Sequence, residues 1–133
     1  VTMLWRAAGE PEPTSNVNPF DDVKETDFFY KAVLWAAEKN ITDGISATEF
    51  GAYKTTNRAQ AVTFLYRYMG QPELNVGGGE TFTDVDVDAF YAAAVMWAIE
   101  NGITNGMGDG TFGVGLPCNR AQAVTFLHRA LAE

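Results

Sequence analysis

Hydrophobic residues recur along this chain at the three- and four-residue spacing of amphipathic helices. The spacing predicts one helix over residues 27–39 and a second over 88–101. Their apolar stripes are formed by Phe28, Ala32, Trp35 and Ala36, and by Phe90, Ala94, Trp97 and Ala98. The two stripes lie 62 residues apart and match position by position, which indicates an internal repeat.

A second kind of helix is predicted over residues 57–69 and 119–132. Both copies open with Asn-Arg-Ala-Gln, in which the asparagine caps free backbone N–H groups and the glutamine reaches back. The residues expected to face inward are Ala61, Val62, Leu65 and Met69, and Ala123, Val124, Leu127 and Leu131. Residues 1–8 form the end of a third copy, because residues 1–6 match 62–67 and 124–129.

The 62-residue repeat extends along most of the chain. We divide it into the end of a first repeat (1–13), a second repeat (14–74) and a third (75–133), together forming one domain over 1–133. This start inside a repeat predicts a fragment of a longer protein. We expect an all-α fold with at most short extended pairs in the loops. The three second-type helices should form a central bundle with pseudo-threefold symmetry.

Composition and charge exclude several classes of function. The net charge of -8, without a basic stripe, argues against nucleic acid as a partner. No apolar run approaches the roughly 20 residues of a membrane span. A single His, a single Cys and no repeated acid–base pair indicate that the chain is not an enzyme. Asp84 and Asp88 begin a calcium-loop pattern that lacks its glycine and its final glutamate, so no metal or cofactor is expected.

The order of the motifs resembles the S-layer homology (SLH) domain family over essentially the whole chain. A Phe-x-Asp-Val opening at 20–23 and 82–85 precedes each aromatic- and alanine-rich helix, and Gly-Asp-Gly-Thr-Phe follows at 108–112. The Asn-Arg-Ala-Gln helices stand where that family has Thr-Arg-Ala-Glu. The first whole repeat lacks the Gly-Asp-Gly loop.

The resemblance implies a non-catalytic module at the bacterial cell surface or in the cell wall, extracellular and often part of an S-layer or another secreted protein. Such modules anchor their proteins by binding a secondary cell-wall polysaccharide, which often bears pyruvate ketals, in grooves between repeats. Peptidoglycan-linked polymer is therefore the expected partner. The alternative is a self-assembly or protein-docking module, because a missing first helix should leave apolar surface exposed around residues 1–8.

The resemblance also nominates polar residues for the grooves. Arg58 and Arg120 each lie in the first turn of a helix. They either bind a ligand carboxylate through two parallel hydrogen bonds or form an internal salt bridge with Asp22 or Asp84. The two aspartates are themselves either part of a groove, or caps and loop anchors.

Aromatic and glycine residues complete the candidate site. Trp35 and Trp97 either belong to the core or stack a ring face on a sugar. Gly108, Asp109 and Gly110 either form a simple turn or let a ligand approach backbone amides. Cys118 is expected to be buried and inert.

Overall fold

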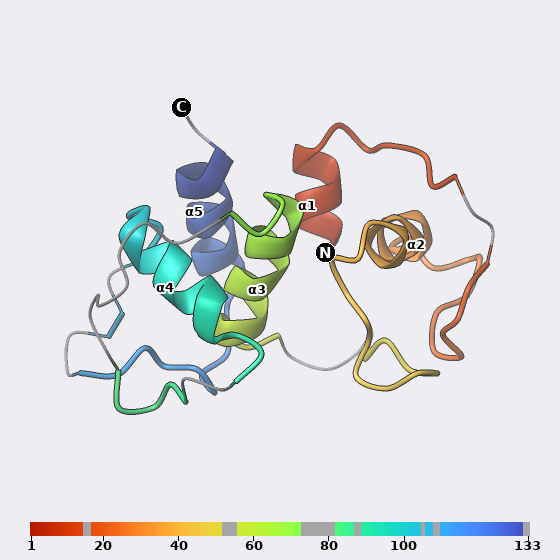
Figure 1. Ribbon diagram of the computed structural model, residues 1–133. Coiled ribbons are helices and arrows are strands. Elements are labelled where there is room, and N and C mark those ends of the chain that lie inside the picture. Colours follow the sequence, from red (N-terminus) through yellow and green to blue (C-terminus); the bar gives the residue numbers. More distant parts are fainter. Residues whose placement is uncertain are drawn as a thin grey trace. The chain divides into compact units, whose positions relative to one another are not determined.

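The computed structural model describes residues 1–14, 17–51, 56–72, 82–86, 89–104, 106–107 and 110–131. These residues form five helices, which are α1 (Thr2–Ala7), α2 (Tyr30–Glu38), α3 (Arg58–Tyr68), α4 (Ala92–Glu100) and α5 (Arg120–Leu131) (Figure 1). They contain no strand, only an isolated bridge between Asn57 and Pro117. The predicted all-α class is confirmed. Within the described ranges, every helix is too short or too polar to cross a membrane.

The chain divides into two compact units, residues 1–54 and 55–133. Each unit combines a second-type helix of one sequence repeat with the first-type helix and loop of the next repeat. The units are therefore offset from the repeats by one helix. The central bundle stays a prediction, because α1 belongs to one unit and α3 and α5 to the other.

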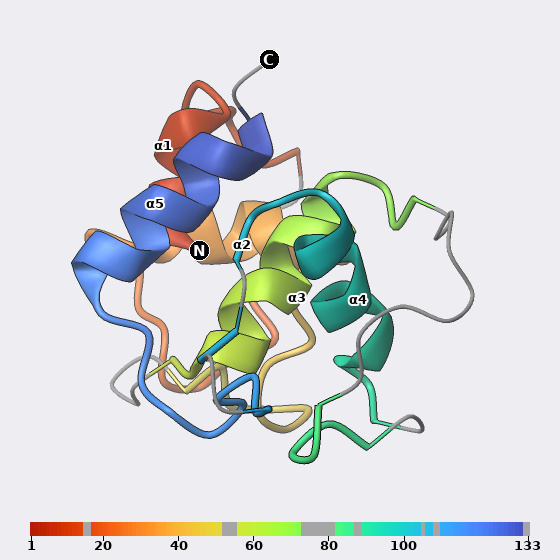
Figure 2. The same ribbon diagram turned by 90° about the vertical axis from the view of Figure 1, so that its left-hand side faces the viewer.

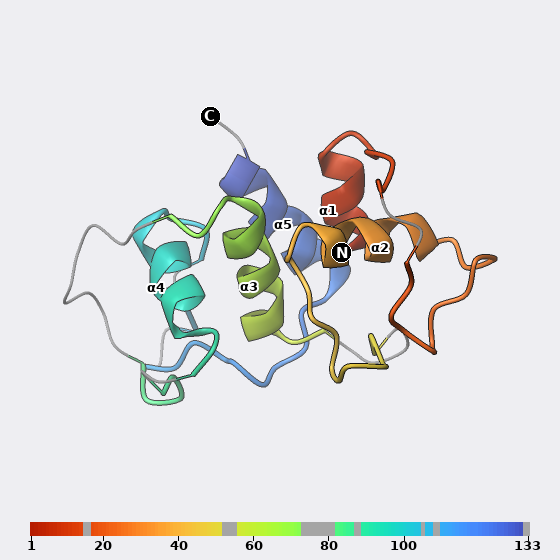
Figure 3. The same cartoon turned by 45° about the vertical axis from the view of Figure 1, so that its right-hand side comes forward.

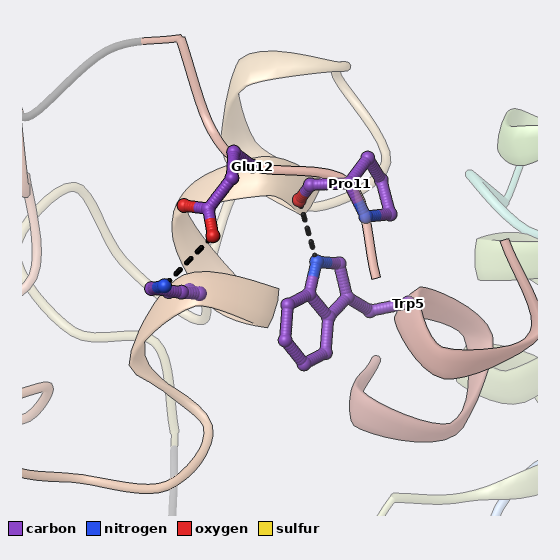
Figure 4. A network of polar contacts seen from close by, with 4 residues as sticks. Trp5, Pro11 and Glu12 are labelled. Carbon is purple, nitrogen blue, oxygen red and sulfur yellow. Dashed lines mark hydrogen bonds and ion pairs between the residues drawn. The ribbon is translucent and has the colours of Figure 1, made fainter. Parts of the chain in front are cut away.

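In the first unit α1 packs against α2 (Figure 3). Val33 of α2 forms a buried cluster with Phe20 and Val23. The segment after α1 is fastened at two points, since the Trp5 indole Nε1 donates to the Pro11 carbonyl at 2.8 Å and Lys31 of α2 pairs with Glu12 at 2.8 Å (Figure 4). The predicted apolar surface around residues 1–8 is not exposed, because Leu4 and Trp5 are buried.

In the second unit α4 and α5 both pack on α3 (Figure 2). Val62 of α3 is fully buried, and the ring of Tyr66 meets that of Trp97 at 5.6 Å between centroids. The two alanines of the α4 stripe, Ala94 and Ala98, are buried as well, which lets the helices approach closely. The periodicity correctly predicted that Val62, Ala94, Trp97 and Ala98 are buried.

The first-type helices begin later than the spacing predicted, at Tyr30 and Ala92 instead of residues 27 and 88. Asp27 does not start a helix; its carboxylate accepts the Lys24 N–H at 2.8 Å, and its own carbonyl accepts the Tyr30 N–H at 3.1 Å. These bonds span three residues and form tight turns instead of α-helix. Asp88 lies outside the described residues.

This later start corrects the predicted stripes at their first position. Phe28 and Phe90 fall in the turns before the helices and are 76% and 67% exposed, so neither belongs to the core. Each ring instead lies edge-on to the next aromatic residue, Phe29 or Tyr91, at 5.2 Å between centroids.

The helix ends otherwise follow the sequence signals. The Asn57 side chain accepts the Gln60 N–H at 2.8 Å while the Gln60 side chain accepts the Asn57 N–H at 2.9 Å, a complete capping box. Asn119 and Gln122 form the same pair of bonds at the start of α5. Asn40 and Gly102, just beyond the ends of α2 and α4, have φ of 60° and 70°, the left-handed conformation that often terminates a helix.

Two inward-facing predictions on the second-type helices are wrong. Met69 follows the last turn of α3 and is 43% exposed. Val124 of α5 is 54% exposed, although its counterpart Val62 is completely buried. In this unit α3 packs on both α4 and α5, and its packing against α4 is the more extensive.

Candidate functional site

The loop that follows α4 is tied to the segment before that helix by a single carboxylate. Asp84 accepts the Phe112 N–H at 2.8 Å on Oδ1, and the Gly113 and Val114 N–H groups at 2.7 and 3.0 Å on Oδ2. Burial by itself raises the pKa of Asp84, but the bonds from these backbone N–H groups outweigh it and hold the pKa below its ordinary value. Asp84 is thus a charged loop anchor, one of the two roles that the sequence left open.

Arg58 reaches the same loop from the first turn of α3. Its side chain is only 5% exposed. Nε donates to the Phe112 carbonyl at 3.1 Å, and Nη2 donates to the Thr104 hydroxyl at 3.1 Å. The guanidinium carbon lies 5.1 Å from the centroid of the Phe112 ring and 5.4 Å from that of Phe126, so two aromatic rings also hold it.

An internal salt bridge between Arg58 and Asp84, one of the alternatives that the sequence left open, is not formed. Removal from water lowers the pKa of Arg58, while Cys118 and Asp84 act in the opposite direction from beyond ion-pair distance. A guanidinium remains charged at neutral pH under such a shift. Asp84 is occupied by the backbone of the loop instead, so the buried cation is satisfied by neutral oxygens and ring faces.

One terminal nitrogen of Arg58 is left for solvent. In the described part of the chain, every fully buried side-chain nitrogen or oxygen has a hydrogen-bond partner. Nη1 donates to none of the described residues, so it must lie at the surface. The site therefore presents a fixed positive group whose outer edge is open.

The first unit repeats the loop anchor. Asp22 accepts the Phe50 and Gly51 N–H groups, both at 2.8 Å, as Asp84 does for their counterparts. The paired rings also recur, Phe20 with Phe50 at 5.6 Å and Phe82 with Phe112 at 5.8 Å. Asp22 is accordingly a loop anchor too, and no arginine hydrogen bond is found on Phe50 or Thr42 among the described residues of this unit.

The structure places both predicted tryptophans in the cores. Trp35 and Trp97 are 3% and 5% exposed, which leaves almost no ring face for a sugar and supports their reading as core residues. Gly110 is exposed, has φ of 87°, and its carbonyl accepts the Thr83 N–H at 3.0 Å. Gly108 and Asp109 lie outside the described residues, as does the side chain of Arg120.

Thr104 and Phe126 were not predicted as part of the site. Thr104 has a repeat partner, Thr42, 62 residues earlier, and each threonine follows a buried isoleucine. The repeat itself therefore marked the position. Phe126 also has a repeat partner, Phe64, but the repeat did not indicate a contact with Arg58, because Phe126 reaches Arg58 from a different helix 68 residues later. Cys118 is only half-buried; burial raises the pKa of its thiol, and the nearby Arg58 opposes that rise.

Comparison with known proteins agrees with this architecture. The S-layer homology domain matches residues 19–62 and again 81–124. A "Cell surface protein" of Thermoanaerobacter kivui is 33% identical over 85% of this chain and 15% of its own length. A "Surface-layer 125 kDa protein" of Lysinibacillus sphaericus is 28% identical over 86% of this chain and 10% of its own. An "Endoglucanase" of Bacillus sp. (strain KSM-635) is 27% identical over 93% and 13%. No solved structure matches the chain.

The chain belongs to the S-layer homology domain family, since that domain covers most of its length in two copies. The chain spans only 10–15% of the length of these three relatives. An S-layer homology domain is a non-catalytic module of surface proteins, which implies attachment to the cell wall and a location at the cell surface.

Proposed function

We propose that this module anchors its protein by binding an anionic secondary wall polysaccharide, with Arg58 as the residue that pairs with the polymer's carboxylates. Pyruvate ketals are the expected source of these carboxylates. The activity of the longer protein then resides elsewhere, and these 133 residues attach it to the wall.

One observation carries the proposal, which is the buried guanidinium of Arg58 without a carboxylate partner among the described residues of its unit. Burying a charge is costly unless an opposite charge or several hydrogen bonds compensate it. Here neutral oxygens engage Nε and Nη2, while Nη1 stays at the surface. An incoming carboxylate would supply the missing counter-charge through a charge-assisted hydrogen bond.

The test uses the whole chain and wall sacculi that retain their secondary polymers. Arg58→Ala should weaken sedimentation with these sacculi by about tenfold to a hundredfold, as expected for losing hydrogen bonds to a charged group. Arg6→Ala is the matched control, because it removes the same charge from an exposed position on α1. Circular dichroism checks that both variants are folded.

The outcomes separate the readings of the site. Binding that disappears from chemically stripped sacculi, and from Arg58→Ala alone, supports anchoring through the polymer. If Arg58→Ala binds as well as the wild type while folded, the proposed role of Arg58 is wrong. Wild-type binding that survives stripping would instead indicate peptidoglycan itself as the partner.

Self-association is a second candidate function, supported by one observation. Val124 exposes 54% of its surface on α5, at a position where the equivalent Val62 is fully buried. An open apolar position of this kind can serve a second copy of the chain. Sedimentation velocity over a rising concentration series decides the question, because a clean monomer throughout excludes this function.

A further inference from the structure

Arg58 has two edges that could receive a carboxylate, and the protein uses one of them. The side edge of a guanidinium is formed by Nε and Nη2, and its end edge by Nη1 with the second N–H of Nη2. Nε donates to the Phe112 carbonyl and Nη2 to the Thr104 hydroxyl, both at 3.1 Å. The side edge is therefore engaged inside the protein.

Thr104 is well suited to fix this orientation. It is 5% exposed and lies just beyond the end of α4, next to the fully buried Ile103. Its hydroxyl oxygen also accepts the Gly106 N–H at 3.3 Å, which couples the hydroxyl to the turn of the same loop. The rings of Phe112 and Phe126 restrict the guanidinium further.

We propose that Thr104 is a positioning residue for ligand binding. Its hydroxyl accepts a hydrogen bond from Nη2 on the protein side, which turns the end edge of Arg58 outward. A glycan carboxylate then binds end-on to that edge. This inference rests on the proposed function of Arg58 and adds the binding geometry. The ligand class is a carboxylate carried on a sugar. Side-on pairing with the same arginine is ruled out by the Phe112 carbonyl and Thr104.

The first unit provides a matched control. Thr42 is the repeat counterpart of Thr104, is likewise 5% exposed, and accepts the Gly44 N–H at 3.1 Å. In the described residues its hydroxyl accepts no bond from an arginine. Thr42→Val therefore removes the same turn hydrogen bond as Thr104→Val, but leaves Arg58 untouched.

The experiment measures binding of four proteins, the wild-type chain, Thr104→Val, Thr104→Ser and Thr42→Val. The probes are purified wall polymer and the same polymer with its carboxylates chemically reduced to alcohols. Thr104→Val should weaken binding to native polymer by about tenfold, the loss expected for one hydrogen bond to a charged group. Thr104→Ser retains the hydroxyl and should bind within about twofold of wild type, as should Thr42→Val.

The reduced polymer distinguishes positioning from a merely structural role. Thr104→Val and wild type should bind the reduced polymer equally weakly. That polymer lacks the carboxylates that Arg58, positioned by Thr104, would bind. If Thr104→Val loses the same factor on both polymers, or if Thr42→Val loses as much, the positioning role is wrong. If wild type itself does not distinguish the two polymers, the proposed function fails, independently of Thr104.

Discussion

The peptide group of Phe112 is held at both of its polar atoms. Its N–H donates to the Asp84 carboxylate at 2.8 Å, and its carbonyl accepts from Arg58 at 3.1 Å. An acid from before α4 and a base from α3 thus meet on one residue of the loop instead of on each other. This explains how two opposite charges can lie in one site without forming an ion pair, which was one of the alternatives that the sequence left open.

Asp84→Asn should destabilise the protein by about 1–2 kcal/mol at pH 7, because a neutral amide accepts the three backbone N–H groups less well than a carboxylate. The lowered pKa fixes the pH dependence. The stabilisation is fully present above the unfolded pKa of about 3.9 and is lost as the pH falls through the lower folded value. Urea unfolding at a series of pH values measures the difference between variant and wild type.

The difference in unfolding free energy should stay constant from about pH 7 to 5 and shrink below about pH 4. Asp22→Asn is the companion variant, because Asp22 anchors the first loop in the same way, through the N–H groups of Phe50 and Gly51. If the difference in unfolding free energy between wild type and Asp84→Asn increased on acidification, the role assigned to Asp84 would be contradicted.

At the level of the site, the sequence predicted which residue types matter but not their partners. The repeated motif predicted Arg58 and Asp84, because both recur at one period. Their partners, Phe112 and Phe126, depend on how α3, α5 and the loop pack together. No local pattern contains that information.

The helices themselves were predictable because their apolar spacing and caps agree. Capping boxes at Asn57 and Asn119 defined the starts of α3 and α5 to within one residue. Such a box is absent from α2, and there the prediction placed the start three residues early. A side chain such as Asp27 can stabilise a turn as readily as a helix start, and only the backbone bonds distinguish them.

The pair Val62 and Val124 tests how much packing, as opposed to sequence, determines burial. Val62→Ala should cost about 2 kcal/mol of unfolding free energy, because the side chain is fully buried and a cavity would remain. Val124→Ala should change stability by less than about 0.5 kcal/mol, since the side chain is 54% exposed and alanine favours the helix.

Chemical denaturation of the two variants gives both values from one experiment. The flanking sequence is the same in both helices from Arg-Ala-Gln-Ala to Thr-Phe-Leu, so helix propensity cancels in the comparison. Equal losses would show that the face around Val124 is as well covered as that around Val62.

At the scale of the whole molecule, the packing units and the sequence repeats differ by one helix. Arg58 belongs by sequence to the second repeat, yet every contact given for its guanidinium is with residues of the third. The proposed binding site therefore combines residues of two successive repeats. Around Phe50, the described residues of the first unit contain the loop and its Asp22 anchor, without an arginine hydrogen bond to Phe50 or Thr42.

The net charge of -8 makes the response to salt informative. An acidic chain and an anionic polymer repel one another at long range, whereas the Arg58 contact acts at short range in a desolvated setting. Raising ionic strength from about 0.01 to 0.15 M shortens the Debye length from about 30 Å to about 8 Å, which screens the repulsion more than the contact. The association rate constant should therefore rise severalfold with salt while the dissociation rate changes little.

Biolayer interferometry on immobilised wall polymer at several salt concentrations measures both rates. Arg58→Ala serves as the control, since its association should show the same rise with salt while its dissociation is faster throughout. Binding that weakens steadily as salt increases would indicate that a cationic surface of the module attracts the polymer. That would contradict attachment through one fixed arginine on an acidic module, because the long-range field of such a module opposes the polymer and only the local geometry favours it.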